Sequence, residues 1–176
     1  MKTQRVWLAV LFMAAYAHAE VIDSGTAGFT VKETVAIKAA PADVYKRFFR
    51  VGDWWNSQHT FSGDAHNLSL EERAGGCLCE KLPNGGGVQH MTIVSLMPGK
   101  SVVLHGALGP LQSLAAAGAM VVALTPADGG TKLEVTYSVA GYLPTGMAAW
   151  AARVDGMVKE QFTRLKSLIE NGDPAK

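Results

Sequence analysis

The chain has 176 residues, of which 48% are hydrophobic and 18% charged, and its net charge is +1. This length predicts one domain, large enough to bury a core of its own. No run of Lys and Arg supplies the positive charge that binding to phosphates requires, so we exclude nucleic acid as a partner.

The N-terminus has the pattern of a signal peptide. Two basic residues precede the apolar run 6–17, and Ala17 and Ala19 are the small residues expected before a cleavage site. The run is shorter than the ~20 apolar residues that cross a bilayer, so no stable membrane span is expected after cleavage. We expect residues 1–19 to be the signal peptide, residues 20–176 to form the domain, and the protein to be periplasmic or secreted. An uncleaved anchor is the alternative.

A half-buried strand and a short helix open the domain. Residues 29–38 alternate in polarity, with Val31, Val35 and Ile37 on one face, as in a strand that is buried on one side. A helix follows from Pro41, because proline is tolerated in the first helical turn.

Strands and turns then alternate as far as a long helix at the C-terminal end. Trp54 begins a second short helix or turn, and a brief helical segment is expected at 109–117. Turn residues separate the predicted strands 67–72, 77–82, 88–97, 101–107, 120–125 and 131–140.

The long helix at 144–170 is the clearest element. Its apolar residues recur at steps of three and four, which makes one continuous stripe. A stripe of this length needs a broad apolar partner, and a curved antiparallel sheet is the only candidate in this chain.

Three short segments carry a resemblance to a known family. The run Ala39-Ala40-Pro41-Ala42-Asp43-Val44 joins the first strand to its helix, Gly75-Gly76 precedes a strand, and Gly129-Gly130 lies in the last hairpin. With the order of elements, they resemble the SRPBCC (START-like) superfamily, of polyketide cyclase/dehydrase and lipid-transport type, over about residues 29–170. The resemblance implies an α+β helix-grip fold, in which a curved antiparallel sheet of about six to seven strands wraps around a long C-terminal helix. It also implies a ligand cavity under that helix but no particular reaction.

Glu80 and His90 are the candidate catalytic pair. A three-residue loop centred on Gly85 sets Glu80 opposite His90 across a hairpin. Leu78 and Leu82 make that face apolar, so we expect the pair to point into the cavity wall. A buried carboxylate and imidazole can act as acid and base near neutral pH. The alternative is a polar pair with a structural role only, and a register slip of one residue would separate the two side chains.

The segment after the first helix offers candidate ligand contacts. Trp54 and Trp55 can cover a cavity and stack on a flat ligand, or they can anchor the core. His59 can join His90 and Glu80, which together have the composition of an iron-binding facial triad. The spacing of these three residues has no motif value, so we predict neither a metal nor another cofactor.

Cys77 and Cys79 are the two cysteines of the chain. Residues two apart on a strand have Cβ atoms ~6.6 Å apart, from the strand rise, and a disulfide needs ~3.8 Å. We therefore rank reduced thiols first, a disulfide second and metal ligands third. A local bulge after Gly75-Gly76 would permit the disulfide.

The sequence leaves three functions open. The first is an exported binding protein for a small hydrophobic molecule. The second is a cyclase, dehydratase or isomerase that uses Glu80 and His90 as an acid-base pair, with a metal-assisted enzyme as a sub-case. The third is a module that binds a protein partner and has a filled core. For the first, the candidate ligand-binding residues are Trp54, Trp55, His59, Leu78, Met91, Trp150, Val154 and Met157. The sequence gives neither the identity of the ligand nor the oligomeric state.

Overall fold

The computed structural model describes residues 18–175, so most of the expected signal peptide lies outside the described part of the chain. The first strand starts at His18, which is two residues before the expected new N-terminus at Glu20. Within residues 18–175, no helix is both long enough and apolar enough to cross a membrane.

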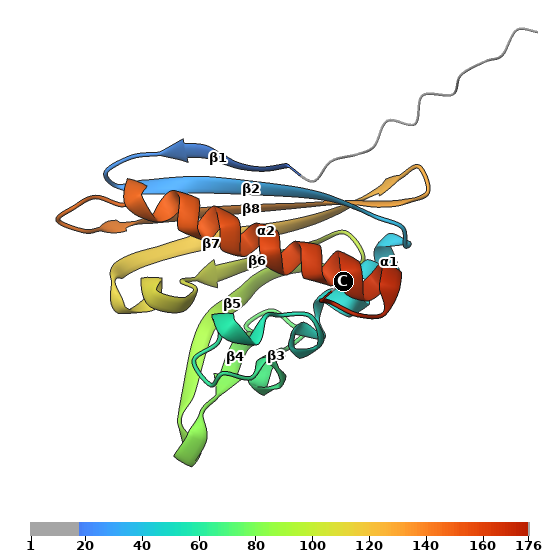
Figure 1. Ribbon diagram of the computed structural model, residues 1–176, viewed down its shortest axis with the longest axis horizontal. Coiled ribbons are helices and arrows are strands. Elements are labelled where there is room, and N and C mark those ends of the chain that lie inside the picture. The colour runs from blue at the N-terminus through green and yellow to red at the C-terminus, as the bar shows by residue number, and fades with distance from the viewer. Residues whose placement is uncertain (1–17, 176) are drawn as a thin grey trace, which may run out of the picture.

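One antiparallel sheet of eight strands forms the body of the protein, in the order β1-β2-β8-β7-β6-β5-β4-β3. Figure 1 shows that the sheet is curved and that β3, β4 and β5 bend away from the other strands. The strands are β1 His18–Ser24, β2 Gly28–Ile37, β3 Leu68–Leu70, β4 Cys77–Lys81, β5 Gly87–Met97, β6 Ser101–Gly106, β7 Ala115–Ala127 and β8 Gly130–Tyr142.

Two α-helices and several short 3₁₀ turns complete the fold. The α-helices are α1 Pro41–Phe48 and α2 Ala148–Asn171, and α2 lies across one face of the sheet (Figure 1). The 3₁₀ turns are η1 Val51–Asp53, η2 Ser57–His59, η3 Ala65–Asn67, η4 Pro83–Gly85 and η5 Gly109–Ser113. The predicted α+β helix-grip fold is confirmed, with an eighth strand because residues 18–24 add β1 at the sheet edge.

One local prediction was confirmed and another was wrong. Trp54 begins a turn between η1 and η2, which is one of the two forms expected for it. The alanine-rich segment is helical only as far as Ser113, and β7 begins at Ala115, which pairs with Tyr142 of β8. Pairing with a long neighbouring strand outweighs the helix propensity of alanine here.

Alternation on the central strands builds the core under α2. Leu133, Val135, Tyr137 and Val139 of β8 are at most 2% exposed, as the sequence predicted. They pack with the buried face of α2, which consists of Ala151, Val154, Val158, Gln161, Phe162 and Leu165. The apolar stripe therefore covers the sheet as expected.

Glu33 interrupts this core. It occupies an inward position of β2, between Val31 and Val35, and it is fully buried with no hydrogen-bond partner for either carboxylate oxygen. Burial raises the pKa of Glu33 to about 7, against a smaller lowering by Lys159, and Asp155 adds to the rise. Both charged neighbours lie on α2.

Stability should therefore depend on pH through Glu33. The pKa is raised in the folded state, so folding is penalised once the carboxylate ionises in the unfolded chain. The penalty grows between pH ~4.5 and ~7 and stays constant above that range. Glu33→Gln removes the group that ionises, so its unfolding free energy should rise relative to that of wild type as the pH increases. The difference between the two proteins should grow by about 2 kcal/mol from pH ~5 to pH ~8. Denaturant unfolding at both pH values measures the gain, and a pH-independent difference would contradict it.

Candidate functional site

A cavity of about 480 Å³ lies between the N-terminal half of α2 and the bent part of the sheet. Its inner wall is apolar and buried, and it includes Leu68, Leu78, Leu108, Leu111 and Val154. Several exposed residues also line it, and these must lie at its opening: Gln58, His59, Phe61, Pro110 and Arg153. Thr60, Gly109, Trp55, Trp150, Met157 and His90 complete the lining.

A bulge in β5 turns His90 toward the cavity. Glu80 pairs with Val88, so the predicted pairing of Glu80 with His90 was wrong. Cys79 of β4 pairs with Gln89 of β5, and the preceding residue, Leu78, pairs with Met91. His90 therefore has no partner on β4 and is the extra residue of a β-bulge. His90 and Met91 are neighbours in sequence, yet both are buried, because the bulge reverses the alternation between them.

Gly106 of β6 gives the bulge room. It pairs with Met91, and a Cβ atom at this position would collide with the carbonyl oxygen of His90. Its φ of +149° also lies in the region that favours glycine. We infer that this glycine allows β6 to approach the bulged strand closely.

The Glu80 carboxylate joins three parts of the site. Its Oε2 accepts hydrogen bonds from His90 Nε2 at 2.9 Å and from the Phe61 amide at 3.2 Å, and its Oε1 accepts one from the Ser62 amide. Glu80 is only 2% exposed. Burial alone raises its pKa, but hydrogen bonds from Ser62, His90 and Phe61 outweigh burial and hold the pKa below its usual range. The buried group is therefore a carboxylate at neutral pH.

This carboxylate orients the imidazole of His90. An ionised carboxylate only accepts hydrogen bonds, so His90 Nε2 carries the proton in the bond to Glu80. In the neutral ring Nδ1 is then an acceptor, and within residues 18–175 no protein group hydrogen-bonds to it. The ring of Phe61 stacks on the imidazole, with centroids 5.9 Å apart and planes at 22°. Phe61 thus covers the imidazole at the side of the opening, where it is 53% exposed.

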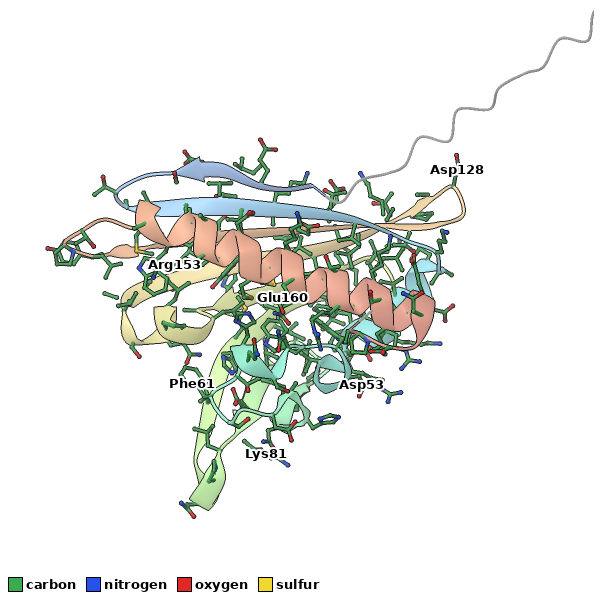
Figure 2. All side chains as sticks on the ribbon, in the orientation of Figure 1. Asp53, Phe61, Lys81, Asp128, Arg153 and Glu160 are labelled. Atoms are coloured by element: carbon green, nitrogen blue, oxygen red, sulfur yellow. A yellow bond between two sulfur atoms is a disulfide. The ribbon has the colours of Figure 1, made fainter. Side chains whose placement is uncertain are left out.

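A second set of contacts fastens the η2 segment to α2. His59 Nε2 lies 3.0 Å from Glu160 Oε2, and Asn56 Nδ2 donates to the other oxygen of Glu160. The backbone amide of Asn56 donates to Oε1 of the buried Gln161 at 2.8 Å. Trp55 Nε1 donates to the backbone carbonyl of His59 at 3.0 Å. These contacts hold Trp55 and His59 in the cavity wall. Figure 2 labels Glu160 on α2, and Phe61 in the segment that follows η2.

The structure brings six of the eight expected ligand contacts to the cavity: Trp55, His59, Leu78, Trp150, Val154 and Met157. Trp54 and Met91 do not line it. Trp54 is 1% exposed, packs on Phe48 and Phe162, and donates to the Phe48 carbonyl, so it anchors the core, the alternative that the sequence had left open. Met91 is 1% exposed and packs in the core below.

Glu80 and His59 occupy positions that differ from those expected from the sequence. Glu80 lies behind His90 and does not line the cavity itself. His59 bonds to Glu160 and does not join His90 and Glu80. Within residues 18–175, no group of three or more His, Cys, Asp or Glu side chains is placed to hold a metal ion.

Sequence reasoning missed the wall made by residues 108–111, together with Phe61 and Arg153. The wall is held from below, because the buried hydroxyl of Tyr137 accepts a hydrogen bond from the Leu108 amide at 3.3 Å. For Phe61, a usable signal was present, since an aromatic residue follows His59 closely in a polar loop. For Arg153, the signal was its position beside the apolar stripe, directly before Val154 and three residues after Trp150.

Cys77 and Cys79 form a disulfide in β4, with Cα atoms 5.3 Å apart. The prediction that ranked reduced thiols first was wrong, because it assumed regular strand geometry. The β4–β5 ladder changes register between Leu78 and Cys79, so the pairing is irregular at this point. The disulfide flanks Leu78, which lines the cavity, and precedes Glu80 directly.

Comparisons with known proteins find likeness in structure alone. No family model matches the chain, and no curated protein matches its sequence. An uncharacterised protein from Rhizobium leguminosarum is similar at a TM-score of 0.62 and 20% identity, over 89% of this chain and 99% of that one. CalU16 from Micromonospora echinospora is similar at a TM-score of 0.61 and 14% identity, over 91% of this chain and 87% of that one.

A third similar structure is DynU16, a protein of the dynemicin biosynthetic locus. Its TM-score is 0.57 at 15% identity, and the match covers 84% of this chain and 49% of that one. The chain has the helix-grip fold. At these identities the likeness establishes the fold alone, and the function has to be argued from the site.

Proposed function

We propose that this protein binds a small, largely hydrophobic molecule in the cavity under α2. The observation that carries the proposal is the cavity itself, because about 480 Å³ lies within the ~300–1,000 Å³ typical of small-molecule sites. A module with a filled core would leave no such space. The apolar inner wall favours a ligand whose body is also apolar, since transfer of apolar surface out of water drives such binding.

The fold supports the same proposal. We propose that the chain belongs to the SRPBCC (START-like) superfamily, and its helix-grip architecture and the short segments that resemble this family support that proposal. DynU16 belongs to a biosynthetic locus, which is compatible with a family that handles small molecules. The site of this chain differs in detail from a general lipid pocket, because His90 in its wall is hydrogen-bonded to the buried Glu80 behind it.

Occupying part of the cavity with a larger side chain should weaken binding. Val154 is 6% exposed and lines the cavity from α2, so Val154→Trp places a large ring in the space. We expect the affinity for decanoate and for 1-decanol to fall more than about tenfold in isothermal titration, since the lost volume cannot be replaced. Ala152→Trp is the matched control, because Ala152 is exposed on the same helix. A folded Val154→Trp protein that binds like wild type would contradict the proposal.

The second candidate is an enzyme that moves protons. The observation in its favour is His90, which lines the cavity and donates to a buried carboxylate, the arrangement that orients a general base in many enzymes. We expect wild type to convert a compound in an extract of small molecules from the producing cells. His90→Gln should abolish that conversion, and Lys100→Gln, in a distant turn, should not. Mass spectrometry of the extract measures the change, and identical conversion by wild type and His90→Gln would exclude this role.

We further propose that the protein is exported. The N-terminal pattern supports export, and so does the Cys77–Cys79 disulfide, because disulfides persist mainly in oxidising compartments. The intact mass of protein from the periplasm or medium, alkylated under denaturing conditions without reductant, should correspond to a chain that starts at Glu20 and carries no alkyl group. A mass that includes Met1, or two alkylated cysteines, would contradict the proposal.

A further inference from the structure

The ionisable residues that line the cavity include no acid. They are Arg153, His59 and His90. Each of the two histidines hydrogen-bonds to a carboxylate outside the lining, His59 to Glu160 and His90 to Glu80. Within residues 18–175, Arg153 has no carboxylate partner. It is therefore the one lining cation whose charge is not already matched by a neighbouring acid.

The position of Arg153 on α2 explains why its guanidinium forms no ion pair along the helix. The residues three and four positions away, where a helical ion pair would form, are Ala149, Trp150, Gly156 and Met157. The guanidinium instead lies over the Trp150 ring, 5.7 Å from its centroid. Figure 2 shows Arg153 on the N-terminal half of α2, toward the loop that carries η5. Because Arg153 is exposed and still lines the cavity, its charge lies at the opening.

This arrangement separates the cavity into two chemical zones. The inner wall is apolar, with Leu68, Leu78, Leu111 and Val154 at most 9% exposed. The opening carries one unpaired guanidinium, whose parallel N–H groups match the two oxygens of a carboxylate. A ligand with an apolar body and one terminal carboxylate would fill both zones at once.

We propose that the natural ligand is an amphiphilic monocarboxylate, with its carboxylate on Arg153 and its apolar body under α2. This inference rests on the proposed binding function and adds the chemical class of the ligand. The volume limits the size: with ~30 Å³ for each heavy-atom-sized group, as for water in the liquid, 480 Å³ holds about 16 non-hydrogen atoms. A medium-length fatty acid or a bicyclic aromatic acid has this size.

The test compares two probes with the same alkyl chain, decanoate and 1-decanol, by isothermal titration on the full protein. Wild type should bind decanoate about tenfold more tightly than 1-decanol, the factor for one partly exposed charge-assisted contact. Arg153→Gln should remove this preference by weakening decanoate binding about tenfold, and Arg153→Glu should reverse it. Added salt should weaken decanoate binding to wild type only, since it screens an exposed charge.

Lys100→Gln is the control, since it removes one positive charge from an exposed turn between β5 and β6 that does not line the cavity. It should keep the wild-type preference for decanoate. Equal binding of both probes by wild type, unchanged in Arg153→Gln, would overturn the carboxylate inference and leave the proposed binding function intact. Binding of neither probe to folded wild type would overturn both.

Discussion

The candidate site depends on one buried carboxylate. Glu80 accepts hydrogen bonds from the amides of Phe61 and Ser62 and from His90 Nε2, and it is 2% exposed. An ionised group at this depth is stable only because its donors replace the water that it has lost. The same bonds fix the loop that carries Phe61 and orient the imidazole in the wall. Without Glu80, the imidazole of His90 would be buried without its partner, and the backbone amides of Phe61 and Ser62 would lose their acceptor.

The location of this carboxylate is compatible with both a binding role and a catalytic role for the site. His90 lines the cavity, whereas Glu80 lies behind His90 and does not line the cavity. A pair in this order can orient a polar group of a bound molecule or move a proton to and from it. Binding needs only the apolar wall and the charge of Arg153 at the opening, whereas catalysis needs in addition a reactive atom next to His90.

The sequence predicted the fold well because periodicity reports burial directly. The alternation in β2 and β8 and the stripe of α2 are one-dimensional patterns, and the structure confirms each of them. The edge strand β1 was missed, because part of it overlaps the expected cleavage site. Glu33 was missed as well, because a single acid within an alternating strand gives no sign of whether it is buried or solvated.

The site was predicted only in part, because it depends on irregular backbone. The Glu80–His90 hydrogen bond exists, yet the regular hairpin used to predict it does not, since a bulge at His90 and a different turn replace it. The same irregular pairing explains why the strand-spacing argument failed for Cys77 and Cys79. Phe61 and Arg153 lie next to predicted contacts in the sequence, but only tertiary packing determines that their side chains reach the cavity.

Hydrogen exchange tests the role of Glu80 most directly. In wild type the amides of Phe61 and Ser62 should exchange slowly, because both donate to the buried carboxylate. In Glu80→Ala their exchange should accelerate at least about tenfold, and more than that of the β8 amides, while Glu71→Ala, at an exposed carboxylate, leaves it unchanged. Equal protection of Phe61 and Ser62 in wild type and Glu80→Ala would contradict the account.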